Sequence, residues 1–373
     1  MIDSRKHVCL ATASAGLEGV VKRELLSLGF EDAKAELGAV RFTADYAGMM
    51  KACLWLACAD RVLIVVREGH AETFEDLFQL VLKAPWSDYL PKDASIPVSG
   101  RCARSKLMSV RDCQSITKKA IVEHMKRAFH TQLLPETGPR FQVDVALHGD
   151  TARLTLDVSG EALNRRGYRT WNGEAPLRET LAAAMARLAF WDKKQPLHDP
   201  CCGTGTLLIE SAFYASHRAP GLNRSFDLER WPYADARELS RLREEAAAAF
   251  DPSLLPAITG SDIDPNALEL CRRHIKQAGM EQYIRVYSAD LRTLTVEGAA
   301  PCFIANPPYG ERLGDKKQCE ELYRAFKPLM LRHPGCSLNL ITSHPGFERV
   351  SGMHSRKKTR MYNGRLECDY MRF

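Results

Sequence analysis

Hydrophobic and polar positions change their period several times within the first 160 residues of this chain. Alternation of apolar and polar residues predicts a strand, whereas apolar residues spaced three or four apart predict a helix. The segments expected to be strands are residues 7–13, 39–43, 61–66, 96–102, 141–147 and 152–158. The segments with helical spacing are residues 17–28, 46–59, 73–82 and 110–129. This order begins as a split βαβ pattern and ends in a hairpin joined by His148-Gly149-Asp150, so it predicts an α+β region.

From residue 175 onward the pattern is strand then helix, repeatedly. The expected strands are residues 197–199, 257–262, 284–289, 302–305 and 337–342. Strands that alternate with helices predict a parallel sheet covered on both faces. The chain ends differently, because residues 359–362 and 365–373 flank Asn363-Gly364, a strong signal for a two-residue turn of type I′. A parallel sheet that ends in an antiparallel pair is typical of class I methyltransferases, whereas a dehydrogenase domain would continue with another crossover.

Length and composition indicate an ordinary multidomain protein. With 373 residues, of which 45% are hydrophobic, the chain can bury a large core and is expected to hold two or three domains. No apolar run approaches the roughly 20 residues needed to cross a bilayer, and the first residues lack the apolar core of a signal peptide. We therefore expect a cytoplasmic protein with no membrane partner. The pattern carries no signal for an oligomeric state.

The twelve cysteines do not indicate a metal site. They are scattered, no CxxC pair occurs, and Cys201 and Cys202 are adjacent inside a turn. In a reducing compartment such cysteines are small hydrophobic core residues. We expect no bound metal.

Positive charge is unevenly distributed. The net charge of the chain is only +6, yet residues 101–127 contain eight basic side chains against the two acidic ones, Asp112 and Glu123. The eight are Arg101, Arg104, Lys106, Arg111, Lys118, Lys119, Lys126 and Arg127. A second basic group consists of Arg349, Arg356, Lys357, Lys358 and Arg360. A solvated helix face explains either group alone, but two of them together favour a polyanionic partner.

The candidate chemistry lies at Asn306-Pro307-Pro308-Tyr309, directly after the buried strand expected over 302–305. Each proline fixes φ and lacks a backbone donor, so the turn is rigid and leaves carbonyl groups free to accept. The Asn306 side-chain oxygen and the Pro307 carbonyl can accept the two hydrogens of a flat exocyclic amine, while Tyr309 stacks on the ring. Such an amine is poorly nucleophilic, and alignment rather than a strong base would then carry the catalysis. The motif predicts methyl transfer to a planar amine.

A glycine turn after the first strand of the second half predicts a cofactor site. Gly203 and Gly205 give a turn without side chains and free N–H groups at a helix N-terminus. The spacing is neither GxGxxG nor GxxxxGK[ST], which disfavours a dinucleotide or a nucleoside triphosphate.

Acidic residues end the next two strands of this half. Asp262 is placed to accept from a ribose diol, and Asp290 from an adenine amino group, whereas Asp264 is expected to cap a helix that starts at Pro265. The glycine turn, these acids and the turn at Asn306 all fall at the carboxyl edge of a parallel sheet, where ligands bind. Together they predict S-adenosylmethionine as the cofactor.

The motifs DPCCGTGT (199–206), GSDID (260–264) and NPPYGERLG (306–314), with APLRET (175–180), resemble those of the THUMP-domain N2-guanine RNA methyltransferases, especially the RlmL/YpsC branch that acts on large-subunit ribosomal RNA. The segment LDVSGEALNRRGYR (156–169) is similar to the end of a THUMP domain and its connector, and the first ~55 residues resemble a ferredoxin-like domain. In some lineages RlmL carries a second methyltransferase module, which this sequence does not show. The resemblance implies a ferredoxin-like domain over 1–55, a THUMP RNA-binding domain over 56–163, a linker over 164–174 and a seven-stranded methyltransferase domain over 175–373.

The same resemblance assigns the site residues. Those implied for catalysis are Asn306, Pro307 and Tyr309. Those implied for the cofactor are Pro176, Thr180, Asp199, Cys201, Gly203, Thr204, Gly205, Asp262, Ile263, Asp290, Leu291 and Asn306. Those implied for RNA are Arg101, Arg104, Lys106, Lys118, Lys119, Arg165 and Arg166.

The expected activity is methylation of the exocyclic N2 of a guanosine in structured RNA, with 23S ribosomal RNA preferred. Transfer RNA is the main alternative substrate. An adenine-N6 DNA methyltransferase, a protein-glutamine methyltransferase and a non-catalytic RNA-binding module are less favoured alternatives. Residues 219–256, an insertion that contains Trp231-Pro232-Tyr233, are expected either to touch RNA or to pack on the flank of the sheet.

Overall fold

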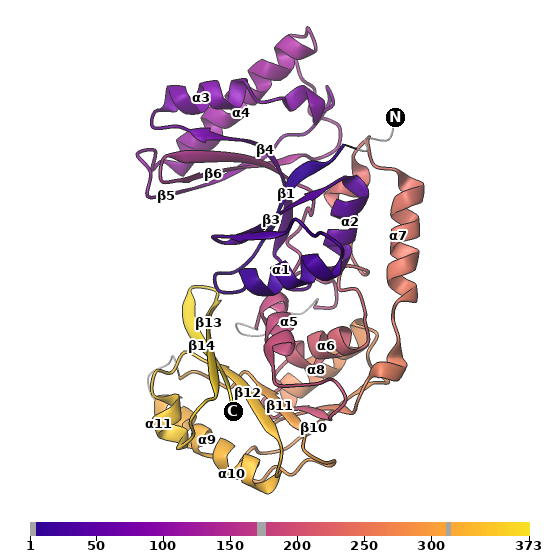
Figure 1. Cartoon of the computed structure of the whole chain (residues 1–373), viewed down its shortest axis with the longest axis vertical. Coiled ribbons are helices and arrows are strands. Elements are labelled where there is room, and N and C mark those ends of the chain that lie inside the picture. The colour runs from indigo at the N-terminus through magenta and orange to yellow at the C-terminus, as the bar shows by residue number, and fades with distance from the viewer. Residues whose placement is uncertain (1–4, 170–176, 311–314) are drawn as a thin grey trace.

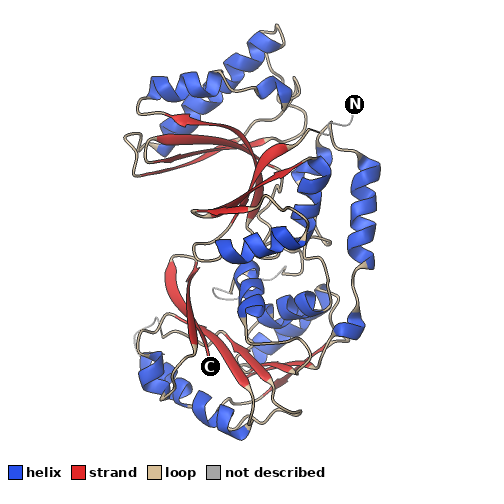
Figure 2. Cartoon of the chain, viewed as in Figure 1, coloured by secondary structure: helices blue, strands red, loops and turns tan. Residues whose placement is uncertain are grey.

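Two seven-stranded sheets, one in each half of the chain, form the framework of the protein (Figures 1 and 2). The computed structural model describes residues 5–169, 177–310 and 315–373. The N-terminal half lies at one end of an elongated molecule and the C-terminal half at the other. This arrangement confirms the predicted fold class, an α/β domain with a mostly parallel sheet preceded by an α+β region.

One continuous sheet spans the whole N-terminal half, in the order β2-β3-β1-β4-β7-β6-β5. Its strands are β1 (His7–Thr12), β2 (Lys34–Glu36), β3 (Ala39–Ala44), β4 (Arg61–His70), β5 (Val98–Ala103), β6 (Gln142–His148) and β7 (Thr151–Asp157). The helices are α1 (Glu18–Ser27), α2 (Tyr46–Trp55), α3 (Phe74–Leu82) and α4 (Val110–Ala128). The long strand β4 pairs with β1 at its start and with β7 along its length, so the two expected units share a single sheet.

The β6–β7 hairpin contains a type I′ turn, the type that the sequence predicted for Asn363-Gly364. His148 pairs with Thr151, so the loop contains only Gly149 and Asp150. Both residues have positive φ, 56° and 58°, as a type I′ turn requires.

The C-terminal sheet has the order β10-β9-β8-β11-β12-β14-β13. Its strands are β8 (Leu197–Asp199), β9 (Ile258–Asp262), β10 (Ile284–Ser288), β11 (Cys302–Ala305), β12 (Ser337–Thr342), β13 (Lys357–Asn363) and β14 (Leu366–Arg372). The first five in space are parallel, and β14 runs antiparallel to both of its neighbours. The reversed strand expected near the sheet edge is therefore present.

Helices cover both faces of this sheet (Figure 1). One face carries α5 (Glu179–Leu188), α6 (Thr206–Ala215) and α8 (Pro265–Gln277), and the other carries α9 (Asp315–Arg324), α10 (Phe326–Arg332) and α11 (Phe347–Ser351). Buried side chains of the first group belong to the large core, and those of the second to a separate cluster around Phe326 and Phe347. The carboxyl ends of the parallel strands are left open between the two layers.

The predicted Asn363-Gly364 turn is wrong by one residue. Asn363 pairs with Leu366, which leaves Gly364 and Arg365 as the two loop residues. Gly364, with φ of 66°, occupies the first loop position, where a type II′ turn needs glycine. The asparagine contributes to the end of β13 instead of to the turn.

The middle part of the insertion at residues 219–256 packs on the N-terminal half. Trp231 is buried and stacks on Phe141, with ring centroids 4.4 Å apart, and its Nε1 donates to the Arg140 carbonyl at 3.0 Å. The Tyr233 hydroxyl donates to the Tyr89 carbonyl. Helix α7 (Ala236–Ala248) runs beside α2 (Figure 1). The end of the insertion packs on the C-terminal half, where Phe250 meets the edge of Tyr283 with ring centroids 6.0 Å apart. Packing on the flank of that sheet, one of the two expectations, is therefore met by this end alone, and Trp231 is closed to RNA.

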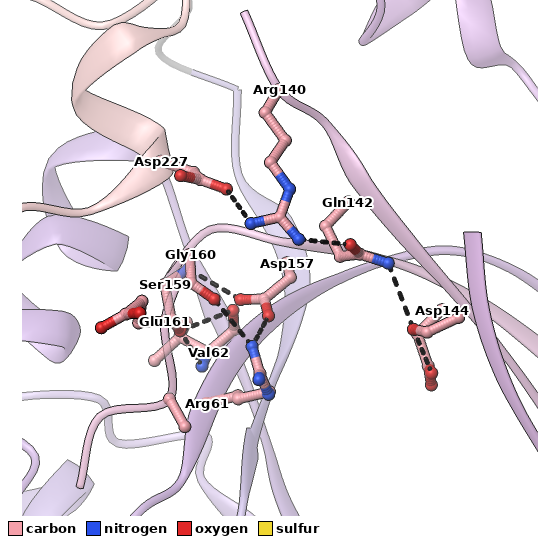
Figure 3. A network of polar contacts seen from close by, with 12 residues as sticks. Arg61, Val62, Arg140, Gln142, Asp144, Asp157, Ser159, Gly160, Glu161 and Asp227 are labelled. Atoms are coloured by element: carbon pink, nitrogen blue, oxygen red, sulfur yellow. Dashed lines mark hydrogen bonds and ion pairs between the residues drawn. The ribbon is translucent and has the colours of Figure 1, made fainter. Parts of the chain in front are cut away.

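Polar contacts fasten the insertion and the connector to the same sheet (Figure 3). Arg140 lies 3.7 Å from the Asp227 carboxylate of the insertion. Arg61, at the start of β4, pairs with Asp157 and donates to the Gly160 carbonyl at 2.9 Å. The segment that leaves the N-terminal half after β7 is therefore held against the first residue of β4.

No helix in the described part of the chain combines the length and the apolar character needed to cross a membrane. Within the same residues, no group of three or more His, Cys, Asp or Glu side chains is arranged to hold a metal ion.

A buried histidine in β8 should make stability depend on pH. His198 is fully buried between the hydroxyls of Thr259, 2.7 Å from Nδ1, and Ser261, 3.1 Å from Nε2, and burial lowers its pKa to about 3. Below a pKa of ~6.5 the unfolded chain binds a proton at this residue that the folded chain does not bind. The free energy of unfolding should therefore fall as the pH drops, by about 2 kcal/mol between pH 6.5 and 5.

Urea unfolding of the wild type and His198→Gln at pH 7.5 and 5 measures this contribution as the difference between the two pH dependences. His148→Gln, a change at an exposed histidine of the β6–β7 hairpin, is the control and should behave as the wild type. Equal pH dependence of all three proteins would contradict the assignment.

Candidate active site

The Asn306–Tyr309 turn begins directly after β11, at the open edge of the C-terminal sheet. Pro307 is buried and Pro308 is exposed. The Tyr309 hydroxyl donates to the Asn306 side-chain oxygen Oδ1 at 2.6 Å. The acceptor expected to receive a target amine is therefore already occupied by a donor from the same motif.

Tyr309 is turned toward the β13–β14 hairpin. Its ring packs against the large core, and Asn363 and Cys368 lie close enough to affect the pKa of its hydroxyl. Burial raises the pKa of Tyr309 well above its usual value, so the hydroxyl keeps its proton. In this conformation the ring is not the open stacking plate that was expected.

Two cavities meet at the open edge of the sheet. The first, of about 480 Å³, is lined by Pro200, Cys201, Asp262, Ile263, Ala289, Asp290, Leu291, Arg292, Pro308, Gly310, Gln318, Cys319, Glu321 and Leu322. The second, of about 410 Å³, is lined by Leu177, Asp199, Cys201, Cys202, Gly203, Thr204, Thr206, Leu207, Asp264, Asn266, Ala267, Leu270 and Asn306. Cys201 borders both, so one ligand can extend from one cavity into the other. The turn reaches both cavities, through Asn306 in the second and Pro308 in the first.

Asp262 links the ends of two loops and still faces the first cavity. Its Oδ2 accepts from the Gly203 N–H at 2.8 Å, and its Oδ1 accepts from the Asp264 N–H at 3.0 Å. Each oxygen keeps a further lone pair, which suits the acceptance of a diol. Beside it Ile263 is 65% exposed and gives the cavity an apolar wall for a flat ring. As expected, Asp264 caps α8 by accepting from the Asn266 N–H at 2.9 Å.

Asp290 is held by an arginine that the sequence reading missed. The Arg292 Nε donates to both carboxylate oxygens of Asp290 at 2.9 Å, and its backbone N–H donates to one of them at 2.9 Å. These bonds lower the pKa of Asp290 and keep it ionised. An adenine amino group would share this carboxylate with Arg292. The sequence signal for this pair was an aspartate followed two residues later by an arginine.

Asp199, at the end of β8, is a buried carboxyl group that suits a cation. It is 1% exposed, and its Oδ1 accepts from the Cys201 N–H at 3.0 Å. Burial raises its pKa well above the usual value, and the nearby Asp262 adds to the shift. Within the described residues no basic side chain pairs with Asp199. A buried carboxylate needs a positive partner, and the ammonium group of S-adenosylmethionine would supply one in the second cavity.

The glycine turn differs from expectation in its hydrogen bonding. The Gly203 N–H is bound to Asp262, and the Gly205 N–H donates to the Cys202 carbonyl at 2.8 Å, so the two donors are not free. Gly203 has φ of 49°, and a Cβ there would meet nothing within 4 Å, so its backbone borders open space. At Gly205, with φ of 85°, a Cβ would lie 2.6 Å from the Cys271 sulfur. Close approach and a left-handed φ require glycine at position 205, whereas at Gly203 only the left-handed φ favours it.

Most of the residues predicted for the cofactor line the two cavities, but among the described ones Thr180 and Gly205 do not. Thr180 is 2% exposed and its hydroxyl donates to Asp60 of the N-terminal half at 3.0 Å, so its side chain serves another contact. Gly205 shapes the turn from behind. Pro176 lies outside the described residues. Sequence reasoning missed Leu177 and Leu207, which lack a polar group, and Gln318 and Glu321 on α9.

The structure contradicts the prediction that Arg166 binds RNA. Its side chain is 2% exposed. Its guanidinium donates to the carbonyls of Leu163, at 2.6 Å, and Ala57, and pairs with the buried Glu210 at 3.4 Å. This arginine holds the protein together and is not available to a partner.

Acidic neighbours reduce the charge of the basic stretch. Arg101 pairs with Asp144, Lys106 with Glu72, Lys118 with Glu136 and Arg165 with Glu161. Within the described ranges, Arg104 and Lys119 have no ion pair. The count of basic residues alone thus overstates the positive potential of this surface. Contacts of these residues with RNA stay a prediction.

Three family models match successive parts of the chain. They are described as the RlmL ferredoxin-like domain (residues 9–63), the THUMP domain (residues 71–157) and the RMKL-like methyltransferase domain (residues 166–372). The last covers more than half of the sequence.

Relatives match almost the entire chain. It is 37% identical to YpsC of Bacillus subtilis (strain 168), whose name places it among the RNA methyltransferases, over 99% of this chain and 96% of that protein. It is 31% identical to the ribosomal RNA large subunit methyltransferase K/L of Syntrophotalea carbinolica, over 97% of this chain but only 53% of that protein. The chain thus spans about half the length of this K/L relative.

Solved structures agree over the full length. SMU.472, assigned as a methyltransferase and complexed with SAH, superposes with a TM-score of 0.94 at 38% identity, covering 100% of this chain and 98% of that one. A predicted N6-adenine-specific DNA methylase from Listeria monocytogenes str. 4b F2365 has the same TM-score and identity, covering 99% and 96%. TrmN from Thermus thermophilus, 21% identical with a TM-score of 0.71 over 99% of each chain, shares the fold.

The buried carboxyl group of Asp199 gives a test of the cofactor site. Asp199→Asn keeps the bond from Cys201 but removes the charge that an ammonium group would pair with, so binding of S-adenosylmethionine should weaken ~10- to 100-fold. Because the ligand favours the ionised carboxylate, wild-type binding should release a proton and tighten as the pH rises through the raised pKa of Asp199.

Calorimetry in two buffers of different ionisation enthalpy counts the released protons. Asp235→Asn, which alters a helix-capping acid at the start of α7, is the control and should bind as the wild type. Unchanged affinity of Asp199→Asn would exclude the ammonium contact.

Proposed function

The chain belongs to the RMKL-like methyltransferase family, and from that premise we propose that it methylates the exocyclic N2 of a guanosine in structured RNA, with 23S ribosomal RNA preferred. S-adenosylmethionine is the methyl donor and supplies an electrophilic methyl group on a positively charged sulfur. The observation that carries the proposal is the Asn306–Tyr309 turn, which lies between the two cavities and presents acceptors, not a base.

The residues of the two cavities divide the binding of the donor between them. Asp199 would hold its ammonium group, Asp262 its ribose diol and Asp290 its adenine amine, while Ile263 packs on the adenine ring. This division supports the proposal because each acid has a lone pair or a charge that its protein partners leave available.

For the base that receives the methyl group, the turn would contribute the alignment of its amine. The Asn306 Oδ1 and the Pro307 carbonyl would accept the two hydrogens of the amine and turn its lone pair toward the methyl group. Formation of the N–C bond would break the bond from sulfur to the methyl group and leave a neutral thioether, and the nitrogen would release one of its two protons to water. For this the Tyr309 hydroxyl must leave Oδ1, and the target amine replaces one donor by another. The released ring can then stack on the base.

RNA as the substrate is supported by the THUMP domain and by the names of the relatives. YpsC is named as an RNA methyltransferase and the K/L proteins as ribosomal RNA methyltransferases. Guanine N2 rests on the resemblance of the motifs, and transfer RNA stays the alternative carrier of the target. Adenine N6 in DNA, the activity predicted for the Listeria protein, is the second candidate, because the same turn can hold either amine.

Two further parts of the sequence reading stay predictions. The division into residues 1–55, 56–163, 164–174 and 175–373 is proposed as the domain organisation. Residence in the cytoplasm is proposed as well.

Nucleoside analysis tests both the reaction and its carrier. In a strain that lacks the gene, mass spectrometry of digested 23S ribosomal RNA should show the loss of one N2-methylguanosine, which the wild-type gene restores. Asn306→Ala should not restore it, because turnover is nearly abolished, although the purified variant still binds S-adenosylhomocysteine. A nucleoside lost from transfer RNA or DNA would replace the proposed substrate, and full activity of Asn306→Ala would refute the role of the turn.

The two roles of Tyr309 can be separated by substitution. Tyr309→Phe keeps the ring but frees Oδ1, so kcat/KM for RNA should be equal to or above the wild-type value. Tyr309→Ala removes the ring, and kcat/KM should fall roughly 5- to 150-fold, the equivalent of a stacking energy of ~1–3 kcal/mol. Steady-state methylation assays distinguish these results, and equal losses in both variants would show that the hydroxyl itself is needed.

A further inference from the structure

A second tyrosine contacts the Asn306–Tyr309 turn from the protein interior. Tyr323, near the end of α9, is fully buried, and its hydroxyl donates to the Pro308 carbonyl at 2.7 Å. Burial raises the pKa of Tyr323 to about 12, so the hydroxyl stays a donor over the whole physiological range. Tyr323 is not among the described residues that line either cavity.

The position of this hydroxyl is fixed by the protein. The ring packs against Phe347, with centroids 4.9 Å apart, and meets the edge of His344 at 5.5 Å. The hydroxyl also lies 3.4 Å from the Oγ1 of Thr342, the last residue of β12, and that oxygen accepts from the His344 N–H at 3.0 Å. Tyr323 therefore connects the turn to the end of a central strand.

The backbone of the turn has few soft torsions. The proline rings fix φ of Pro307 and of Pro308. Asn306 and Pro307 each precede a proline, which restricts their ψ to the extended region. Pro308 precedes Tyr309, so its ψ is the one torsion within the pair of prolines that the sequence leaves free. The direction of a carbonyl group is set by the ψ of its own residue, and the Pro308 carbonyl is the group that Tyr323 holds.

We propose that Tyr323 is a positioning residue for methyl transfer, which fixes ψ of Pro308 and thereby the placement of Tyr309 relative to the acceptors on Asn306 and Pro307. The inference rests on the proposed function of the turn. Tyr323 touches neither the base nor the donor, and it acts through the Pro308 carbonyl alone.

The inference predicts a loss confined to turnover. Tyr323→Phe keeps the ring and its packing but releases the Pro308 carbonyl, which is part of an exposed residue and can bind water instead. When ψ of Pro308 varies, Tyr309 is placed correctly relative to the amine acceptors for only part of the time, so the base is misaligned and kcat should fall about tenfold or more. The affinity for S-adenosylhomocysteine should stay at the wild-type value because no residue of the cavities has changed.

A matched control exists in Tyr370 of β14. It is also fully buried, and its hydroxyl donates to a backbone carbonyl, that of Met185, at the same distance of 2.7 Å. Tyr370→Phe therefore removes a hydrogen bond of the same length to a carbonyl of α5 and not to one of the turn. Tyr370→Phe should lose at least as much thermal stability as Tyr323→Phe, because Met185 is fully buried and water cannot replace the lost donor, and it should keep the wild-type kcat.

The experiment measures kcat, KM for RNA and binding of S-adenosylhomocysteine for the wild type, Tyr323→Phe and Tyr370→Phe, with kcat expressed per binding site so that unfolded protein does not count. A wild-type kcat for Tyr323→Phe, or an equal loss of kcat in both variants, would overturn the inference. Methyl transfer is followed as label entering whichever nucleoside the wild type modifies. A target other than guanine N2 then refutes the proposed function but leaves the comparison of the variants intact.

Discussion

The buried guanidinium of Arg166 is the interaction on which the arrangement of the two halves depends. It contacts Ala57 and Leu163 in the N-terminal half and Glu210 in α6. The loss of one partner would leave a charge in the interior without compensation, at a cost of about 3–5 kcal/mol. Because α6 begins directly after the glycine turn, the same helix that shapes the cofactor site also fixes the N-terminal half.

Other contacts join the same two halves. Asp60, beside β4, accepts from Arg178 at 2.9 Å, and Glu24 of α1 pairs with Arg187 of α5 at 2.8 Å. Gly16, with φ of 89°, lies so close to β13 that a Cβ there would clash with the Arg360 carbonyl. The N-terminal half thus reaches the hairpin against which Tyr309 rests. An RNA bound by that half would be presented to the turn in a fixed direction.

The spacing of apolar residues and the motifs were enough to predict most of the fold. Long strands and helices bury one face, so apolar residues recur along them at a regular spacing. The short strand β2 was missed because its three residues are not buried and show no apolar alternation. The sequence predicted the acids at the sheet edge, since a parallel sheet places the carboxyl ends of its strands together. It could not distinguish Arg166 from Arg165, because charge alone does not reveal burial. The hydroxyls of Tyr309 and Tyr323 were also beyond prediction, since their bonds depend on side-chain directions that no local pattern encodes.

The bond between Tyr309 and Asn306 bears on how the proposed site selects its target. An acceptor left without a donor in a partly buried site costs about 1–3 kcal/mol, and the Tyr309 hydroxyl removes that cost in the free enzyme. A base with an exocyclic amine restores the bond when it displaces the hydroxyl, so the number of hydrogen bonds is nearly unchanged. A base without that amine would displace the hydroxyl and leave the acceptor empty. Discrimination between bases then arises from the hydrogen bond to Asn306 that a base without the amine fails to restore. The freed Tyr309 ring stacks on any base and adds affinity without specificity.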